Sequence, residues 1–181
     1  MAMTSAELDR WVPDPQIRTC HARTSRADPD ALWAAAKAVR LDETRTIGRL
    51  VRWRIPGVRP DQTFAGMLAE DPFTVLDAGE RHVVSGLVGR IWTIARDYPR
   101  LDGPDAFLAW SEPRTVRVLF AHWVQVEDDG SSTLVSEARV APTDRVASMR
   151  LKSLWLVVGP FERLIGAEPL ALAAAGAERG G

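Results

Sequence analysis

Apolar residues change their spacing along this chain, and the change predicts where helices and strands alternate. Residues 16–24 alternate between apolar and polar positions and contain β-favouring types, which predicts a first strand. In residues 29–40 the apolar positions recur every three to four residues after an Asp-Pro helix start, so a helix is predicted there. A second helix is predicted over 44–54, and a short helical turn around 64–68.

From residue 73 the period shortens to two, which indicates β-strands. Gly79, Pro113 and the run from Asp128 to Ser131 separate the segments at positions typical of turns. Consecutive strands joined by short turns imply an antiparallel meander. The predicted strands are 73–78, 80–92, 106–110, 114–127 and 132–141. Within the second of these, Gly86 suggests a bulge, a bend or a close approach by another group.

The chain returns to helical spacing near its C-terminus. Asp144 can cap a long helix whose apolar stripe runs to Leu164. Pro160 removes one helical hydrogen bond, so we expect a kink near Leu156, and we expect Pro169 to end or bend the helix again.

The 181 residues suffice for one domain. Residues 1–14 are polar and end in prolines, which predicts a flexible N-terminal arm, although Trp11 in that arm could dock on the body. We place a single domain at 15–177 and a disordered tail at 178–181. The predicted class is α+β: a curved antiparallel sheet of six to seven strands wrapped around a long C-terminal helix, with two short helices after strand 1.

Four segments resemble an uncharacterised bacterial branch of the START-like (SRPBCC) helix-grip superfamily, which includes polyketide cyclases, lipid-transfer domains and plant ligand-binding allergens. The segments are Gly86-Leu87-Val88-Gly89-Arg90-Ile91-Trp92, Phe107, Thr133 to Val140, and Trp155 to Phe161. The sequence departs from the branch pattern at Leu154, where the pattern has tyrosine, and at Gly166-Ala167, where it has basic residues. The resemblance implies a helix-grip fold that encloses an apolar cavity open near the two short helices. A fold alone does not license a function.

Composition removes several classes of protein. With 46% apolar residues and a net charge of -1, the chain is neither disordered nor a generic polyanion binder, so we expect no nucleic-acid partner. Its longest apolar stretch, 154–161, is far below the ~20 residues of a membrane span, so we expect no stable membrane insertion. No signal peptide is recognisable, and Cys20 is the single cysteine, which together indicate a cytoplasmic protein.

Motif searches exclude further classes of site. The sequence contains no phosphate-binding G-x-x-x-x-G-K-[ST] loop, no H-E-x-x-H zinc motif and no G-x-S-x-G nucleophile elbow. The three histidines are far apart in sequence, and one cysteine cannot complete a zinc site without carboxylates. We therefore expect neither a metal nor a cofactor.

One group of candidate site residues follows from strand register. If Asp129-Gly130 forms a two-residue hairpin loop, His122 faces Glu137, and Phe120 faces Arg139. The valine-rich face of 116–126 would then carry these ionisable groups into the cavity. A three-residue loop with a bulge would instead move Glu137 and Arg139 to the face of Trp123.

The roles of these residues stay open at this level. Glu137 and Arg139 are two apart on one strand, so they could form a structural ion pair, anchor a ligand, or assist acid–base chemistry with His122. Arg90 and Trp92 share a predicted strand face, and could hold an anionic or aromatic ligand or serve a structural pairing with a carboxylate.

Three functions are consistent with these observations. The first is a binding domain for a small apolar or amphipathic ligand, with His122, Glu137, Arg139, Arg90, Trp92 and Phe120 as the predicted ligand-binding residues. The second is a polyketide cyclase or hydratase-like enzyme that uses His122 and Glu137. The third is a non-catalytic structural or interaction protein, a homodimer formed by the sheet face that carries Trp123.

Overall fold

The computed structural model describes residues 3–45, 48–49, 57–93, 98–159 and 162–180. Its centre is a five-stranded antiparallel sheet with the strand order β1-β5-β4-β3-β2. The strands are β1 (Ile17–Ser25), β2 (Thr74–Gly79), β3 (His82–Gly89), β4 (Val116–Val126) and β5 (Ser132–Pro142). The α+β class and the antiparallel meander are confirmed, but the described residues form a sheet of five strands instead of six to seven.

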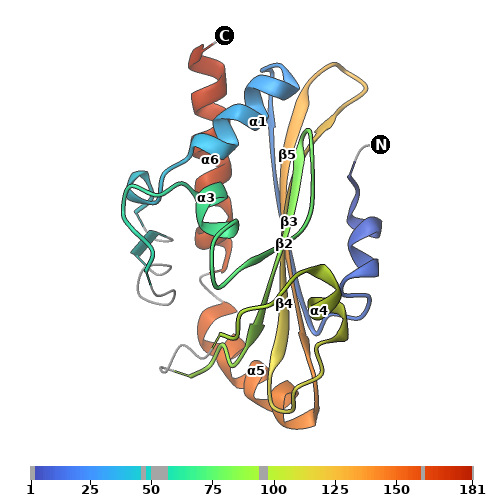
Figure 1. Ribbon diagram of the computed structural model, residues 1–181. Coiled ribbons are helices and arrows are strands. Elements are labelled where there is room, and N and C mark those ends of the chain that lie inside the picture. The colour runs from blue at the N-terminus through green and yellow to red at the C-terminus, as the bar shows by residue number, and fades with distance from the viewer. Residues whose placement is uncertain (1–2, 46–47, 50–56, 94–97, 160–161, 181) are drawn as a thin grey trace.

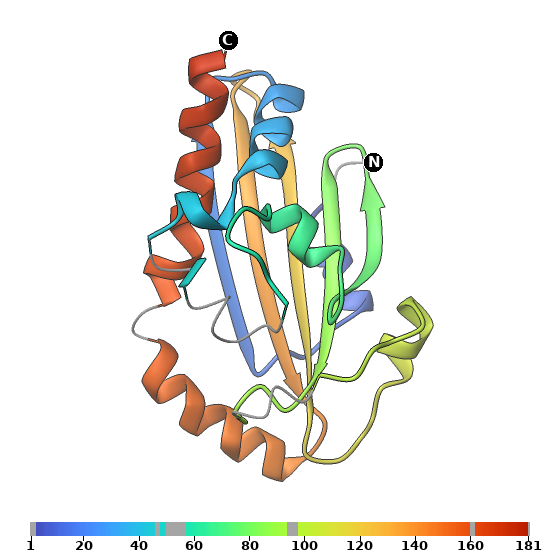
Figure 2. The same cartoon turned by 60° about the vertical axis from the view of Figure 1, so that its left-hand side comes forward.

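Helices cover both faces of the sheet (Figures 1 and 2). One face, called the helical face below, carries α1, α3 and α6, and α5 crosses its lower end. The opposite face, called the N-terminal face, carries η1 and α4. The helices are η1 (Ser5–Arg10), α1 (Pro29–Ala38), η2 (Leu41–Glu43), α3 (Phe64–Leu68), α4 (Pro104–Ala109), α5 (Arg145–Val158) and α6 (Glu162–Gly180).

The predicted first helix is confirmed as α1. The Asp28 carboxylate accepts hydrogen bonds from the backbone N–H groups of Asp30 (2.8 Å) and Ala31 (3.4 Å), which satisfies two of the free donors at the helix start. Leu32 and Trp33 are buried against α6 and the sheet. Most of the helix predicted over 44–54 lies outside the described residues. Within that range, Gly48 and Arg49 are described and are helical.

The N-terminal segment lies against the sheet, whereas its polar composition suggested a flexible arm. Leu8 and Val12 are fully buried, and Trp11 is 6% exposed with its ring edge against Phe107. Together with Met3, these three side chains carry most of the apolar surface of the segment, and their burial outweighs the cost of ordering the backbone.

The segment 106–110, predicted as a strand, is the helix α4. Pro104 stands at the first helical position, and Phe107 is fully buried between the sheet and Trp11. A five-residue apolar run is too short for its period to separate a strand from a helix turn. This error accounts for one of the missing strands.

The C-terminal region forms two helices in place of one long helix. Helix α5 ends at Val158, and Pro160 lies outside the described residues. Helix α6 continues through Pro169 to Gly180, so Pro169 does not end the helix, and residues 178–180, predicted as part of a disordered tail, are helical. The helix beyond Pro169 buries Leu170 and Ala173 against α1, which offsets the lost hydrogen bond.

The β4–β5 hairpin has a three-residue loop, so the predicted register is wrong by one residue. Val126 pairs with Ser132, the Glu127 N–H donates to the Ser131 carbonyl (2.9 Å), and Gly130 has a φ of +80°. The Asp129 carboxylate accepts hydrogen bonds from both the N–H and the hydroxyl of Ser131, which stabilises this turn. The shift exchanges the two faces for every side chain of β5.

Candidate functional site

A row of polar side chains crosses the middle of the helical face. Antiparallel pairing places His21 opposite Ser136, and Ser136 opposite His122. One step along the strands, a second row consists of Thr19, Ala138, Phe120 and Ser85. Because side chains of paired residues project from the same face, these two rows form one surface in the centre of the sheet, called the central patch below.

The central patch is less tightly covered than the surface on either side of it. Above it, the upper apolar cluster packs Leu134 and Val124 against α1 and α6; below it, the lower apolar cluster packs Val118 and Val140 against Leu151 of α5. In the central patch itself every side chain except Ser85 is half-buried. Several of these side chains are small, namely Thr19, Ser85, Ser136 and Ala138.

The His122 imidazole is neutral in this position. Burial lowers its pKa from 6.5 to about 4. Burial is the cause of this shift, and among the residues that the structure describes no hydrogen bond or ion pair to this side chain is found. A neutral imidazole offers one donor and one acceptor, and both remain available.

Six buried side-chain atoms have no hydrogen-bond partner in the described part of the chain, and Ser85 Oγ is the one among them that belongs to the central patch. They are Trp11 Nε1, His82 Nε2, Ser85 Oγ, Trp92 Nε1, Trp123 Nε1 and Ser132 Oγ. The Ser85 hydroxyl lies in the central patch on a residue with no exposed surface, and the Trp92 indole N–H lies beside the lower apolar cluster. Buried polar groups are nearly always hydrogen-bonded, so unpaired ones call for an explanation such as a water or a ligand.

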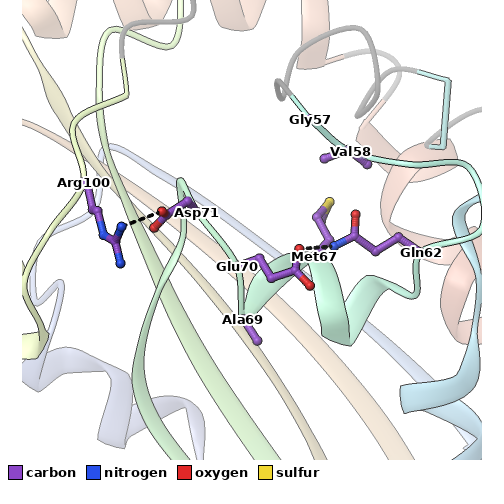
Figure 3. Close-up of a pocket in the computed structure, with 8 residues that line it drawn as sticks. All are labelled: Gly57, Val58, Gln62, Met67, Ala69, Glu70, Asp71 and Arg100. Atoms are coloured by element: carbon purple, nitrogen blue, oxygen red, sulfur yellow. Dashed lines mark hydrogen bonds and ion pairs between the residues drawn. The ribbon is translucent and has the colours of Figure 1, made fainter.

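A pocket of about 510 Å³ opens beside α3 (Figure 3). The Gln62 amide donates to Glu70 (2.9 Å), and Arg100 forms an ion pair with Asp71 (3.1 Å). Its apolar lining, Met67 and Val58, belongs to the lower apolar cluster, so the pocket reaches the edge of that cluster. The lining residues are Gly57, Val58, Gln62, Met67, Ala69, Glu70, Asp71 and Arg100.

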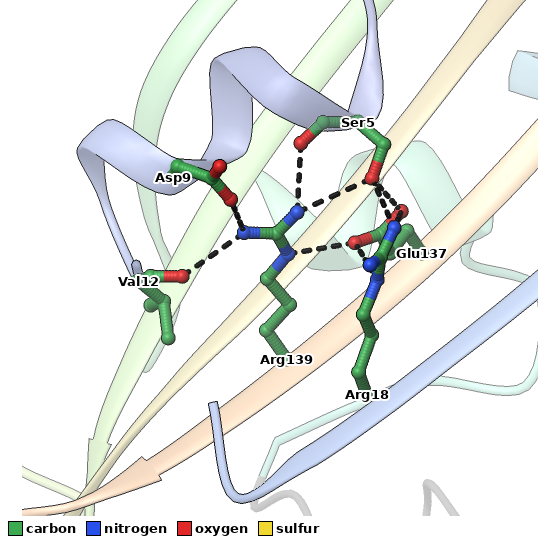
Figure 4. A network of polar contacts seen from close by, with 6 residues as sticks. All are labelled: Ser5, Asp9, Val12, Arg18, Glu137 and Arg139. Carbon is green, nitrogen blue, oxygen red and sulfur yellow. Dashed lines mark hydrogen bonds and ion pairs between the residues drawn. The ribbon is translucent and has the colours of Figure 1, made fainter. Parts of the chain in front are cut away.

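Glu137 and Arg139 lie on the N-terminal face, across the sheet from His122 (Figure 4). The Glu137 carboxylate, which has no exposed surface, accepts hydrogen bonds from Arg139 (2.6 Å), Arg18 (2.9 Å) and the Ser5 hydroxyl (2.6 Å). Arg139 also donates to Asp9 and to the carbonyls of Ser5 (2.7 Å) and Val12 (3.0 Å). This network joins the N-terminal segment to β5.

The polar groups of this network bind one another, which leaves few hydrogen-bonding positions for a ligand. Burial alone would raise the pKa of Glu137, but hydrogen bonds from Ser5, Arg139 and Arg18 outweigh it and hold the pKa below its usual value. All three nitrogens of the Arg139 guanidinium donate to groups of the protein itself. The predicted cluster of His122, Glu137 and Arg139 in one pocket is therefore not formed, and the register that a three-residue loop imposes is the reason.

The other predicted site residues are divided between two places. Phe120 lies in the central patch, half-buried and edge-on to Phe73. Arg90 and Trp92 do not share a strand face, because β3 ends at Gly89 and the chain turns there, with the Thr93 N–H and hydroxyl donating to the Arg90 carbonyl. Sequence reasoning missed Ser136, which the correct hairpin register would have placed opposite His122, and Ser85, which pairs with Phe120 on the neighbouring strand β3.

Comparisons with known proteins assign this chain to no family. No family model matches the chain, and no curated protein matches it. A hypothetical protein from Helicobacter pylori, jhp0584, has 7% identity and a TM-score of 0.39, with 92% of each chain covered. The structure of Ara h 8.0201 has 12% identity and a TM-score of 0.35, covering 90% of this chain and 98% of that one.

The described ranges contain neither a metal-binding cluster nor a membrane-spanning helix. No group of three or more His, Cys, Asp or Glu side chains there is arranged to hold a metal ion. None of the helices described has the length and apolar content that crossing a membrane requires.

Proposed function

We propose that this chain is a binding domain for a small, largely apolar molecule, held over the central patch of the helical face. The observation that carries the proposal is the combination of small, partly exposed side chains with the neutral His122 imidazole and the unpaired Ser85 hydroxyl, between two tightly packed apolar clusters. Binding pockets are mostly apolar surfaces with a few polar groups that fix orientation. The helix-grip resemblance of the sequence agrees with this proposal.

The ligand should carry an uncharged polar group, such as a hydroxyl or a carbonyl. A neutral His122 and the Ser85 hydroxyl both donate and accept hydrogen bonds, and neither supplies a charge. Arg139, one of the predicted ligand-binding residues, has no role in the proposal, because its guanidinium is occupied by the N-terminal segment. A charged ligand group would thus lack a counter-charge at the patch.

The pocket beside α3 is the proposed entrance. Its volume of about 510 Å³ lies within the range of typical small-molecule sites, roughly 300–1,000 Å³. Met67 forms both its wall and part of the lower apolar cluster, so a ligand entering there would meet apolar surface first. The paired charges of Arg100 and Asp71 mark its outer rim.

The structure does not support the sequence arguments for the two other candidate functions. A cyclase-like or hydratase-like reaction requires His122 and Glu137 in one pocket, but these residues lie on opposite faces of the sheet. A homodimer was to use the face of Trp123, but that side chain is 3% exposed and packs with the N-terminal segment. We retain a cytoplasmic location and a single domain as proposals, with the N-terminal segment included in that domain.

Native mass spectrometry of freshly purified protein tests the binding function. We expect a retained small molecule on the wild type and its loss in Ala138→Phe, because the larger ring would fill the space over the central patch. Ala22→Phe is the matched control, since Ala22 is exposed on the other face of β1. Wild-type protein that carries no molecule, or a molecule that Ala138→Phe retains in full, would contradict the proposal.

A further inference from the structure

Helix α5 exposes an apolar stripe to solvent. Leu156 is 81% exposed, Val157 68% and Met149 61%, although α5 has a second apolar side that packs on the sheet. At 100° per residue these three positions and Val146 fall along one side of the helix. The exposed Ser153 lies on the same side and separates Met149 from Leu156 and Val157. Soluble proteins expose single apolar residues routinely, but several gathered on one side of a helix indicate an interaction surface.

The buried side of α5 shows that this orientation is fixed by the protein. Leu151 is 1% exposed and Trp155 packs against the lower apolar cluster. Ser148 and Gln16 exchange hydrogen bonds, and the Asp144 carboxylate caps the helix by accepting from the Ala147 N–H (2.7 Å). The apolar stripe therefore cannot turn inward without breaking these contacts.

Positive charge borders the stripe on both sides. Arg150 lies along one edge, Arg145 and Lys152 lie along the other, and all three are exposed. No aspartate or glutamate occurs between residues 145 and 158. An apolar stripe between cationic edges is typical of helices that lie in the interface of an anionic membrane.

We propose that α5 docks the protein reversibly on the surface of a bilayer that contains anionic lipid, with Leu156, Val157 and Met149 entering the interface. The alternative occupant, a second copy, fits less well: pairing two α5 stripes would place the cationic edges of one copy against those of the other. The proposal goes beyond the binding function and rests on α5 alone, so either can fail without the other.

Vesicle flotation with the full chain tests the proposal. We expect the wild type to bind vesicles of phosphatidylcholine mixed with phosphatidylglycerol, to bind phosphatidylcholine alone weakly, and to be released by high salt. Leu156→Ser combined with Val157→Ser should lower binding at least about tenfold. Arg150→Gln combined with Lys152→Gln should lower binding to the anionic vesicles by roughly 30-fold.

Matched variants elsewhere on the surface control for non-specific hydrophobic adsorption and for net charge. Val126→Ser removes an apolar side chain that is 59% exposed, and Arg26→Gln with Lys37→Gln removes two exposed cations. Both control variants should bind the vesicles as the wild type does. The proposal is overturned if the wild type binds neither vesicle type, if the control variants lose as much binding as the α5 variants, or if light scattering without lipid shows a dimer that Leu156→Ser dissociates.

Discussion

Replacing Glu137 by glutamine tests whether the buried carboxylate holds the N-terminal segment on the sheet. Glutamine keeps the shape of the side chain but removes its charge, and its NH2 group would face the donors of Arg139, Arg18 and Ser5. Removing one partner of a buried ion pair destabilises a protein by about 3–5 kcal/mol. The Arg18 side chain is 52% exposed and can be solvated by water, so we expect the lower end, about 3 kcal/mol.

Acid should remove this difference between the wild type and the variant. The folded state lowers the pKa of Glu137 below its ordinary value of 4.5. A carboxyl whose pKa is lowered on folding stabilises the protein above the unfolded pKa, and that contribution is lost as the pH falls through the folded pKa. The free energies of unfolding of wild type and Glu137→Gln should therefore converge below about pH 4.5.

Urea denaturation at neutral pH and in acid measures both effects. Asp77→Asn is the control, because Asp77 forms an ion pair with Arg10 of the same N-terminal segment (2.7 Å), with exposed fractions of 33% and 56%. An exposed pair contributes at most about 1 kcal/mol. Equal losses for Glu137→Gln and Asp77→Asn, or a difference that persists unchanged in acid, would refute the reasoning.

Three further predictions concern single residues. The His122 imidazole should titrate by NMR with a pKa of about 4, and a titration near 6.5 would contradict its burial. The free energy of unfolding should fall as the pH drops from 6.5 towards 4, and this loss should be absent in His122→Gln. Phe107→Ala should lower the free energy of unfolding by about 3–5 kcal/mol, since Phe107 has no exposed surface, and a denaturation midpoint equal to the wild type would place it outside the core. Gly86→Ala should lower the free energy of unfolding by about 1–3 kcal/mol, because a Cβ there would lie 2.6 Å from the Phe107 ring. The double variant with Phe107→Ala should lose less free energy of unfolding than the sum of the two single variants. Strict additivity would show that the two side chains do not touch.

The strands and the first helix could be predicted because each has enough residues to show its period. The runs 16–24, 114–127 and 132–141 each match one observed strand closely, and Gly86 does mark a close approach, by Phe107. The segment 106–110 could not be assigned correctly, because its single turn of helix depends on Phe107 reaching the sheet. The packing of Leu8 and Trp11 likewise depends on tertiary contacts that a local pattern does not contain.

The candidate site depended on a single loop residue. Placing Gly130 at the third position of a three-residue loop, instead of the second of a two-residue loop, moves Glu137 from the face of His122 to the face of Trp123. Asp-Gly is compatible with both loops, and the Ser131 hydrogen bonds to Asp129 that favour the longer one are not visible in a two-residue motif. His122 and Phe120 were correctly placed together because they lie on one strand.

Titration with Nile red, a neutral apolar dye with a carbonyl acceptor, tests the proposed ligand site most directly. We expect saturable fluorescence with the wild type and at least about tenfold weaker binding to Ala138→Phe, which fills the central patch. Ala22→Phe on the opposite face and Leu156→Ser on α5 should both bind like the wild type, which separates the central patch from other apolar surfaces. Equal binding by Ala138→Phe, or no saturable binding by the wild type, would contradict a ligand site on the helical face.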